Sequence, residues 1–313
     1  MSKRNKLIAL AAIGAMSVCM LTGCATTSVE PALGPQGDYI GVIEVHGEIG
    51  PSADDSMFAT PAGYDHDAAM EFVNEMMEDN TNKGIFLSLD TPGGTVYESD
   101  ELYLKLMEYK EETGRPVYAY MHSVAASGGY YIAASADEIY ANRNTTTGSI
   151  GVIMGGYEMS ELFEKVGIKE IAITSGPNKA MGSAATPMTE EQIAIYQSHV
   201  DEAYDVFVEI VAQGRKMDEA RVREIADGRI YTAKQALELN LIDGIDTAEA
   251  YKEKVLESIG ADVEFYTPEE PAEDFMSMLM GKINAMIPKS DAEMLKEFYE
   301  ANSSMVPMYY YGG

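Results

Sequence analysis

The residues of this chain best suited to chemistry lie in one short segment, residues 123–135, where a turn of small residues leads into an apolar helix. Ser127 lies at that corner and is followed directly by Gly128 and Gly129. A serine in such a turn exposes its hydroxyl group, and the glycines leave neighbouring backbone amides unobstructed. Acyl transfer needs this combination of a nucleophile and donors for the oxyanion. The alternative is that the small residues only let a helix pack closely on a strand.

A second glycine turn favours the chemical interpretation. Residues 91–94, Thr-Pro-Gly-Gly, follow another predicted buried strand. Because the carboxyl ends of parallel strands meet at one edge of a sheet, both turns should emerge together. We expect the amide of Gly93 or Gly94, together with that of Gly128, to bind the oxyanion, and one such donor contributes about 3 kcal/mol of transition-state stabilisation. A simple tight turn is the alternative for this motif.

The four histidines are the first candidates for the general base that a serine nucleophile requires. His66 lies in an acidic loop and His199 on a predicted long helix, and both positions are typical of solvated side chains. His46 ends the first predicted strand. His122 precedes Ser127 by five residues, on the strand that leads to the corner, so its side chain would struggle to turn back. None of the four has an evident carboxylate partner in the sequence.

Lys179 is the other candidate base. It lies among small residues at 175–185, and no carboxylate occurs between Glu170 and Glu190. A lysine acts as a base only when it is neutral, so burial must lower its pKa from about 10.4 to about 7–8. A solvated loop lysine is the alternative.

The elements that must position these residues alternate between strands and helices, which predicts a parallel β-sheet with helical cover. Strands are predicted at residues 39–46, 84–90, 116–121, 138–142 and 169–174. Helices are predicted at residues 67–79, 96–112, 128–134, 158–166, 189–213, 218–226, 232–239, 247–258, 272–287 and 292–301. Thr189, followed by two glutamates, is typical of a helix N-terminus.

The N-terminus predicts export and lipidation. Residues 1–23 combine a basic head with a short apolar stretch, and small residues come directly before Cys24. We expect a lipoprotein signal peptide and acylation of Cys24, followed by a flexible linker over residues 24–37. An ordinary secretory leader or a signal anchor is the alternative. Since the other cysteine, Cys19, lies within the leader, the mature chain has no free thiol for a nucleophile, a disulfide or a thiolate metal site.

Charge excludes another class of function. The chain has 51 acidic and 22 basic residues, a net charge of −29, and loses three of its basic residues with the leader. Such a surface repels nucleic acid and anionic lipid headgroups, so we expect no nucleic-acid partner and a lipid anchor that holds the protein at the membrane. We expect no metal ion and no cofactor.

Five motifs in sequence order carry a resemblance to a known family. They are residues 91–94, 126–131, 147–152, 175–179 and 228–232. Together they resemble the short, single-repeat form of the signal peptide peptidase A family of bacterial serine–lysine proteases, over roughly residues 39–260. The resemblance implies a ClpP/crotonase-like α/β fold, with Ser127 as nucleophile, Lys179 as base and Ser149 as the serine that orients the lysine amine. Ala180 departs from the pattern, because an aspartate usually follows the lysine.

The resemblance also implies the organisation and role of the chain. Residues 38–260 would form the peptidase domain, and residues 261–313 further helices and an apolar tail. Relatives assemble into rings or domes with sites at subunit boundaries, so a homo-oligomer, an octamer, is expected. The tail at 304–313 is expected to dock in a groove of a neighbour or in the chain's own substrate cleft.

The expected function is that of a serine endopeptidase tethered to the extracytoplasmic face of the cell membrane, which cleaves remnant signal peptides and other short hydrophobic or unfolded peptides. Two other functions fit the same fold. One is a peptide-binding scaffold without catalysis. The other is a crotonase-type acyl-CoA enzyme, which needs a cytoplasmic cofactor and gives Ser127 no role.

Overall fold

The structure is a computed structural model, and it describes residues 34–35, 37–52, 63–260, 262–268 and 307–310. The chain divides into two compact units, Met1–Gln36 and Gly37–Gly313, and every element below belongs to the second. The strands are β1 (Tyr39–His46), β2 (Asn82–Thr91), β3 (Gly93–Thr95), β4 (Val117–Ala126), β5 (Glu138–Ala141), β6 (Thr146–Gly148), β7 (Ile230–Thr232), β8 (Gly244–Ile245), β9 (Glu264–Tyr266) and β10 (Met308–Tyr310). The helices are α2 (His66–Glu78), α3 (Val96–Thr113), α4 (Gly128–Ala133), α5 (Ser160–Val166), α6 (Glu190–Arg215), α7 (Glu219–Ile225), α8 (Ala233–Glu238) and α9 (Ala248–Ile259).

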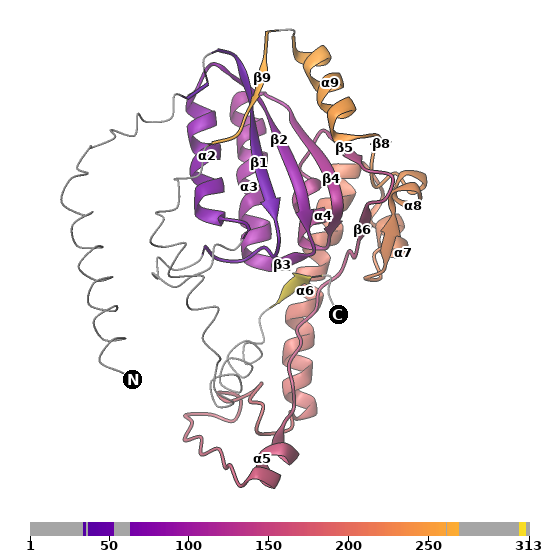
Figure 1. Cartoon of the computed structure of the whole chain (residues 1–313). Helices are drawn as coiled ribbons and strands as arrows, with labels where there is room; N and C mark the ends of the chain where they lie inside the picture. The colour runs from indigo at the N-terminus through magenta and orange to yellow at the C-terminus, as the bar shows by residue number, and fades with distance from the viewer. Residues whose placement is uncertain (1–33, 36, 53–62, 261, 269–306, 311–313) are drawn as a thin grey trace, which may run out of the picture. The chain divides into compact units, whose positions relative to one another are not determined.

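Most of the described strands form one sheet (Figure 1). Eight strands pair in the order β7-β6-β4-β2-β1-β9, with β5 pairing with both β4 and β8. All these pairs are parallel except β6 with β7. Strands β3 and β10 form a separate antiparallel pair. The predicted α/β fold with a mostly parallel sheet is therefore confirmed.

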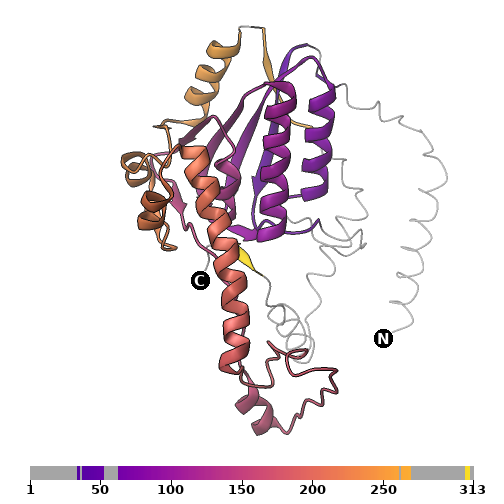
Figure 2. The same cartoon turned by 180° about the vertical axis from the view of Figure 1, so that it is seen from behind.

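Helices cover both faces of the sheet. Successive residues of a strand point to opposite faces, so Ile43 joins the larger core while Val42 joins the smaller one. The larger core lies beneath α2, α3, α4 and α6, three of which are seen in front of the sheet in Figure 2. The smaller core lies beneath α9, which contributes Tyr251 and Val255. This two-sided burial explains why the central strands are nearly continuous apolar runs.

The longest helix begins where the sequence predicts. The Thr189 side chain accepts a hydrogen bond from the Gln192 backbone N–H, and the Gln192 side chain accepts one from the Thr189 N–H. This reciprocal pair satisfies two donors that a helix N-terminus otherwise leaves unpaired. From there α6 runs for 26 residues, a length of about 39 Å.

Two parts of the prediction did not match what is described. The expected strand at 169–174 is wrong: the segment is irregular, and Ile171 and Ile173 are 87% and 97% exposed. The two isoleucines are two positions apart, as in a strand, but they lie beyond the sheet, at the far end of α6. The short strands β3, β6, β7, β8 and β9 were missed, because two or three residues carry too little periodicity to be read.

Several predictions fall on parts of the chain that are not described. They are the leader at 1–23, Cys24, most of the linker and the helices at 272–287 and 292–301. Within the described ranges, no helix combines the length and the apolar character that a membrane span requires.

Candidate active site

Ser127 and Ser149 lie side by side at the carboxyl ends of two paired strands. In the parallel ladder between β4 and β6, Ala126 lies opposite Gly148, and each serine follows directly. The Ser127 N–H donates to the Gly148 carbonyl oxygen at 2.8 Å. The sheet therefore brings together these two predicted site residues, which are far apart in the sequence.

The backbone at Ser127 is strained. Its φ of 54° and ψ of −114° lie outside the regions that non-glycine residues prefer, and α4 begins at the next residue. Such strain costs roughly 1–3 kcal/mol and persists where the surrounding structure imposes it, often at functional sites. The Ser127 side chain is buried, and among the described residues its Oγ has no hydrogen-bond partner. A sharp strand-to-helix turn with an unengaged hydroxyl is the geometry of a nucleophile.

The predicted oxyanion glycines gather beside Ser127. A Cβ atom built on Gly128 would lie 3.2 Å from the Gly94 nitrogen, and one built on Gly93 would lie 2.6 Å from the Gly128 nitrogen. The Gly93 N–H already donates to Thr91 Oγ1 at 3.0 Å. Of the two alternatives in this turn, the Gly94 amide is thus the better one to pair with Gly128.

The C-terminal strand β10 lies in the same place. It runs antiparallel to β3, with Tyr309 opposite Gly94, and Figure 1 shows it in yellow beside β3 and α6. On its other edge Met308 exchanges two backbone hydrogen bonds with Ile153, both of 3.0 Å. The described part of the predicted docking tail therefore lies in a groove of its own chain, next to the glycine cluster.

Ser149 opens onto a pocket. It is buried, has a φ of 51°, and its N–H donates to the Arg229 carbonyl oxygen at 2.8 Å. The pocket beside it has a volume of about 480 Å³ and is lined by Ser149, Ile153, Asp201, Tyr204, Asp227 and Tyr310, among others.

Lys179 is not brought to Ser127 within one chain. Its loop is fixed to the start of α6, where the Asn178 side chain donates to Glu191 at 3.4 Å. The serine end of the site contacts α6 much later, through a ring contact of 4.9 Å between Tyr131 and Phe207. Phe207 comes sixteen positions after Glu191 in α6, a distance of about 24 Å along the helix axis. Lys179 is exposed at the far end.

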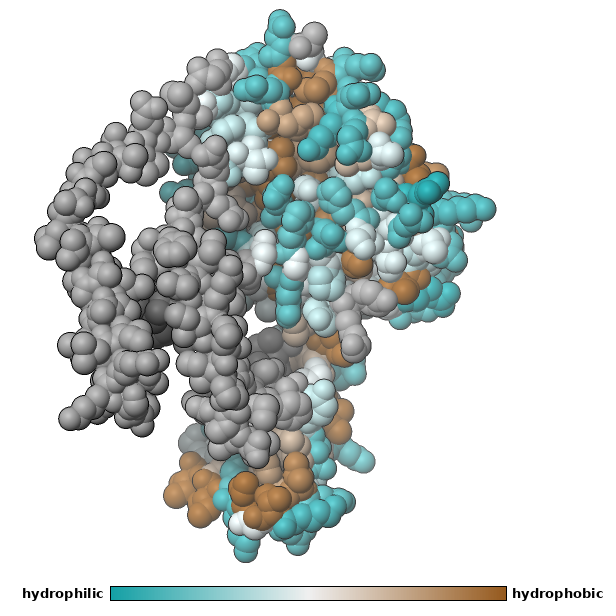
Figure 3. All heavy atoms as spheres, viewed as in Figure 1, coloured by the Kyte–Doolittle hydropathy of each residue, from teal (hydrophilic) through white to brown (hydrophobic). Residues whose placement is uncertain are grey.

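The part of the chain that carries Lys179 has an apolar surface. We call residues 153–193, which include α5 and the loop to α6, the arm. Its exposed apolar residues are Ile153, Tyr157, Leu162, Val166, Ile168, Ile171, Ile173 and Ile193. Figure 3 shows brown, hydrophobic spheres gathered at the lower end of the molecule, where α5 lies in Figure 1. Exposed apolar patches of this kind are typical of interaction surfaces.

Two of the four histidines, His122 and His66, form hydrogen bonds away from Ser127. The His122 Nε2 lies 2.9 Å from Ser88 Oγ rather than near Ser127, and burial lowers the pKa of His122. His199 is exposed on α6, as expected. The expectation for His66 is wrong: it is buried, and it does have a carboxylate partner, because its Nε2 lies 2.8 Å from Glu101.

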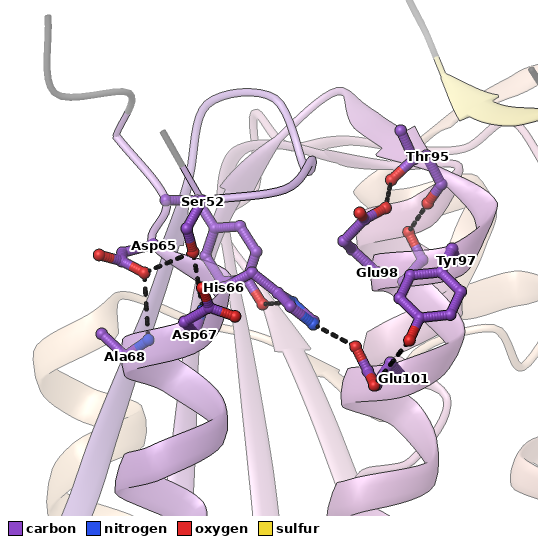
Figure 4. A network of polar contacts seen from close by, with 11 residues as sticks. Ser52, Asp65, His66, Asp67, Ala68, Thr95, Tyr97, Glu98 and Glu101 are labelled. Carbon is purple, nitrogen blue, oxygen red and sulfur yellow. Dashed lines mark hydrogen bonds and ion pairs between the residues drawn. The ribbon is translucent and has the colours of Figure 1, made fainter. Parts of the chain in front are cut away.

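Figure 4 shows the His66 network between the start of α2 and α3. His66 Nδ1 lies 2.9 Å from the Tyr64 hydroxyl, so both ring nitrogens are occupied. The hydrogen bond from His66 lowers the pKa of Glu101. The sequence analysis missed this pair, because His66 and Glu101 are 35 positions apart and lie on two different helices. The network ties α2 to α3 and leaves His66 no nitrogen for a base.

Two residues that support the site were also missed. The Thr91 hydroxyl holds the Gly93 amide, and Ser99 Oγ would lie 2.6 Å from a Cβ on Gly128 while it donates to the Thr95 carbonyl oxygen. Thr91 could have been found as the first residue of the Thr-Pro-Gly-Gly turn. No signal in the sequence points to Ser99. Within the described ranges, no cluster of His, Cys, Asp or Glu is suited to hold a metal ion.

Comparison with known proteins finds peptidases among the relatives of this chain. Residues 109–262 match peptidase family S49. The chain is 35% identical over 282 residues to an Enterococcus faecium protein that bears the name signal peptide peptidase SppA, covering 87% of this chain and 80% of that protein. It is 40% identical over 198 residues to a protein named as a protease from Synechocystis sp., covering 62% of this chain and 71% of that protein. It is 32% identical over 179 residues to protease 4 of Haemophilus influenzae, covering 57% of this chain and 29% of that protein.

Proposed function

The chain belongs to peptidase family S49, the family of SppA and protease 4, and on that premise we propose that it is a serine endopeptidase whose nucleophile is Ser127. The observation that carries this proposal is the strained turn at Ser127. A buried hydroxyl without a partner lies at the edge of the sheet, beside two glycine turns that converge on it. A purely structural serine has no need of either feature.

The general base is Lys179, and it comes from a neighbouring subunit. Within one chain, the loop that carries Lys179 is fixed to the start of α6, about 24 Å along the helix from the part that contacts the serine end of the site. The arm that carries it exposes isoleucine and leucine side chains that a second copy would bury. Head-to-tail contacts between identical subunits form a closed ring when the rotation from one subunit to the next closes. A homo-oligomeric ring would therefore build each site from two subunits.

Ser149 orients the incoming amine. It adjoins Ser127 through the Ala126–Gly148 pair and opens onto a pocket that the lysine side chain of a neighbour could enter. Asp227 in that pocket is already paired with Arg229. This pairing weakens the attraction of Asp227 for an entering ammonium group, while Asp201, which also lines the pocket, accepts a hydrogen bond from the Gln197 side chain. A neutral lysine near Ser127 is the condition for general-base catalysis.

The reaction then proceeds by acyl transfer. The lysine amine takes the proton of Ser127 Oγ as that oxygen attacks the peptide carbonyl carbon. The amides of Gly94 and Gly128 donate to the oxyanion. The lysine returns its proton to the leaving amine, and water releases the acyl group from Ser127 by the reverse sequence.

The location and substrates complete the proposal. A lipid on Cys24 would tether the enzyme to the extracytoplasmic face of the cell membrane, and a linker over residues 24–37 would separate it from the bilayer. Remnant signal peptides are short, apolar and unfolded, and a relative bears the name signal peptide peptidase. Such segments can enter a groove as extended strands, as β10 does.

Three variants assayed on an unstructured peptide test the proposal. Ser127→Ala and Lys179→Ala should each lower kcat/KM by about 10⁴-fold or more, because the nucleophile and its base act as a unit. Ser149→Ala should cause a smaller loss. The rate should rise from neutral to alkaline pH as the lysine loses its proton. Near-wild-type hydrolysis by either dyad variant, or an acidic optimum, would contradict the dyad. A binding scaffold would show no hydrolysis at all.

A further inference from the structure

The nucleophile and the oxyanion glycines follow two neighbouring strands. Strand β4 ends at Ala126 and leads directly to Ser127, whereas β2 ends at Thr91 and leads to the glycine turn. The two strands pair with each other and lie side by side in Figure 1. The register between β2 and β4 therefore determines how far the serine hydroxyl lies from the glycine amides.

This register shifts just before the site. The ladder is regular as far as Leu89 and Met121. Where it is interrupted, a single residue of β2, Asp90, lies opposite three residues of β4, 122–124. We call residues 122–124 the bulge. Bulges bend a strand, and next to active sites they change the direction of a side chain.

The bulge determines where Ser127 leaves the sheet. Beyond it, Thr91 lies opposite Ala125, whereas an uninterrupted ladder would place Ser123 there. Two extra residues correspond to about 6.6 Å of extended chain. With the bulge, Ser127 is two positions beyond this pair, as Gly93 is on the other strand. Without the bulge, the serine would lie about 6.6 Å past the glycine turn.

Asp90 holds the bulge in place. Because the bulge interrupts the ladder, its N–H groups need acceptors other than the neighbouring strand. Asp90 Oδ1 accepts a hydrogen bond from the Val124 N–H at 3.0 Å. The Asp90 carbonyl oxygen also accepts one from the Gly47 N–H at 3.0 Å, which ties this residue to the end of β1.

Other side chains hold the start of the bulge. Ser88 Oγ lies 2.9 Å from His122 Nε2, and the Thr145 hydroxyl donates to the His122 carbonyl oxygen. Of these contacts with the bulge, the one from Asp90 lies nearest in sequence to Ser127. Asp90 also directly precedes the Thr-Pro-Gly-Gly turn. One carboxylate thus connects the two segments that carry the nucleophile and the oxyanion donors.

We propose that Asp90 is a positioning residue for the peptidase reaction: its side chain holds the Val124 N–H and so fixes the register that places Ser127 beside the oxyanion glycines. The geometry of the acceptor oxygen carries this role, and the negative charge does not. Asp90 acts through the two strands and makes no contact with substrate. This inference rests on the proposed peptidase function.

Three variants of the full-length protein, assayed on a quenched fluorescent peptide, test the inference. Asp90→Asn keeps an acceptor oxygen in the same place, so kcat should stay within about threefold of wild type. Asp90→Ala removes the acceptor, and Asp90→Glu keeps the charge but moves the oxygen by one methylene group. Both should lower kcat by about 100-fold with little change in KM, because a misplacement of about 1 Å costs about that factor. The Asn and Glu variants decide the test even if Asp90→Ala does not fold.

Asp137 offers a matched control at the other end of β4. Its Oδ2 accepts a hydrogen bond from the Val117 N–H at 2.9 Å, and its Oδ1 pairs with Lys110 at 2.7 Å. Asp137→Ala therefore removes the same kind of contact from the same strand, away from the serine. It should lower the melting temperature and leave kcat unchanged.

The possible results separate the positioning role from the peptidase function. A wild-type kcat in Asp90→Glu, or equal losses in Asp90→Asn and Asp90→Glu, would overturn the positioning role and leave the peptidase function standing. A loss of kcat in Asp137→Ala as large as that in Asp90→Glu would also overturn it, because general destabilisation would then explain both. Hydrolysis that survives Ser127→Ala would instead overturn the peptidase function on which the inference rests.

Discussion

Two inactive variants should restore each other if the dyad is shared between subunits. Ser127→Ala removes the nucleophile and keeps Lys179, whereas Lys179→Ala removes the base and keeps Ser127. Within one chain, the loop of Lys179 is fixed to α6 at Glu191, and the serine end of the site contacts α6 at Phe207. These two positions are about 24 Å apart along the helix axis. A site that takes its serine from one subunit and its lysine from the next is intact wherever a Lys179→Ala subunit receives the lysine of a Ser127→Ala neighbour.

The expected yield follows from counting subunit boundaries. In a closed ring of randomly mixed subunits at equal amounts, each boundary has one chance in two of carrying an intact serine and one in two of receiving an intact lysine. About one quarter of the sites should therefore be active. If both residues of a site came from one subunit, no site would be active at any mixing ratio.

The assay uses co-expression of the two variants with different affinity tags. Sequential purification on both tags isolates mixed assemblies, and hydrolysis of an unstructured peptide is compared with that of wild type. The control replaces the Lys179→Ala chain with a chain that carries both substitutions, which should give no activity. Recovery near one quarter supports a shared site. Mixed assemblies that are as inactive as the single variants would refute the reasoning.

Three further predictions follow from the geometry. Gly128→Ala should lower kcat by about 100-fold or more and also lower the melting temperature, since the new Cβ would lie 2.6 Å from Ser99 Oγ and 3.2 Å from the Gly94 nitrogen, in the space for the oxyanion; an unchanged kcat contradicts this placement. Tyr309→Ala should raise the peptidase rate, because the loss of the ring contacts with Tyr131 and Phe207 weakens the pairing of β10 with β3 beside the glycine cluster; an unchanged rate would mean that β10 does not compete with substrate. Burial lowers the pKa of His122 below its usual value of 6.5. As the pH falls, the unfolded chain therefore takes up a proton on this residue before the folded chain does. The stabilisation from neutral His122 is therefore complete above about pH 6.5 and is lost as pH falls through the lower folded pKa; denaturant titrations of His122→Gln should show a weaker acid dependence than wild type, while His199→Gln should match wild type.

The fold was largely predictable from the sequence, because strong local signals agree with it. The first strand was predicted at its observed bounds, and the capping residue Thr189 marks the start of α6. Runs of apolar residues between helical patterns indicate buried parallel strands. The segment at 169–174 failed because its alternation of isoleucines has the period of a strand, while the arm offers it no sheet to join.

The sequence predicted only those parts of the candidate site whose functional residues lie within a single turn. Ser127 and the two glycine turns are local features, and the parallel sheet brings them to one edge. The position of Lys179 depends on how far the start of α6 extends beyond the sheet. A short stretch of sequence cannot predict this distance. The ring contacts of Tyr309 with Tyr131 and Phe207 join three distant parts of the chain, so the sequence showed an aromatic tail but not the register of β10.

The most direct test of the central claim is covalent labelling of the native, full-length protein with a fluorophosphonate probe. The label should lie on Ser127 when the modified peptide is mapped by mass spectrometry, and Lys179→Ala should abolish rapid labelling, because the serine then lacks its base. An active preparation whose label maps to another residue, or that resists the probe altogether, would contradict Ser127 as the nucleophile.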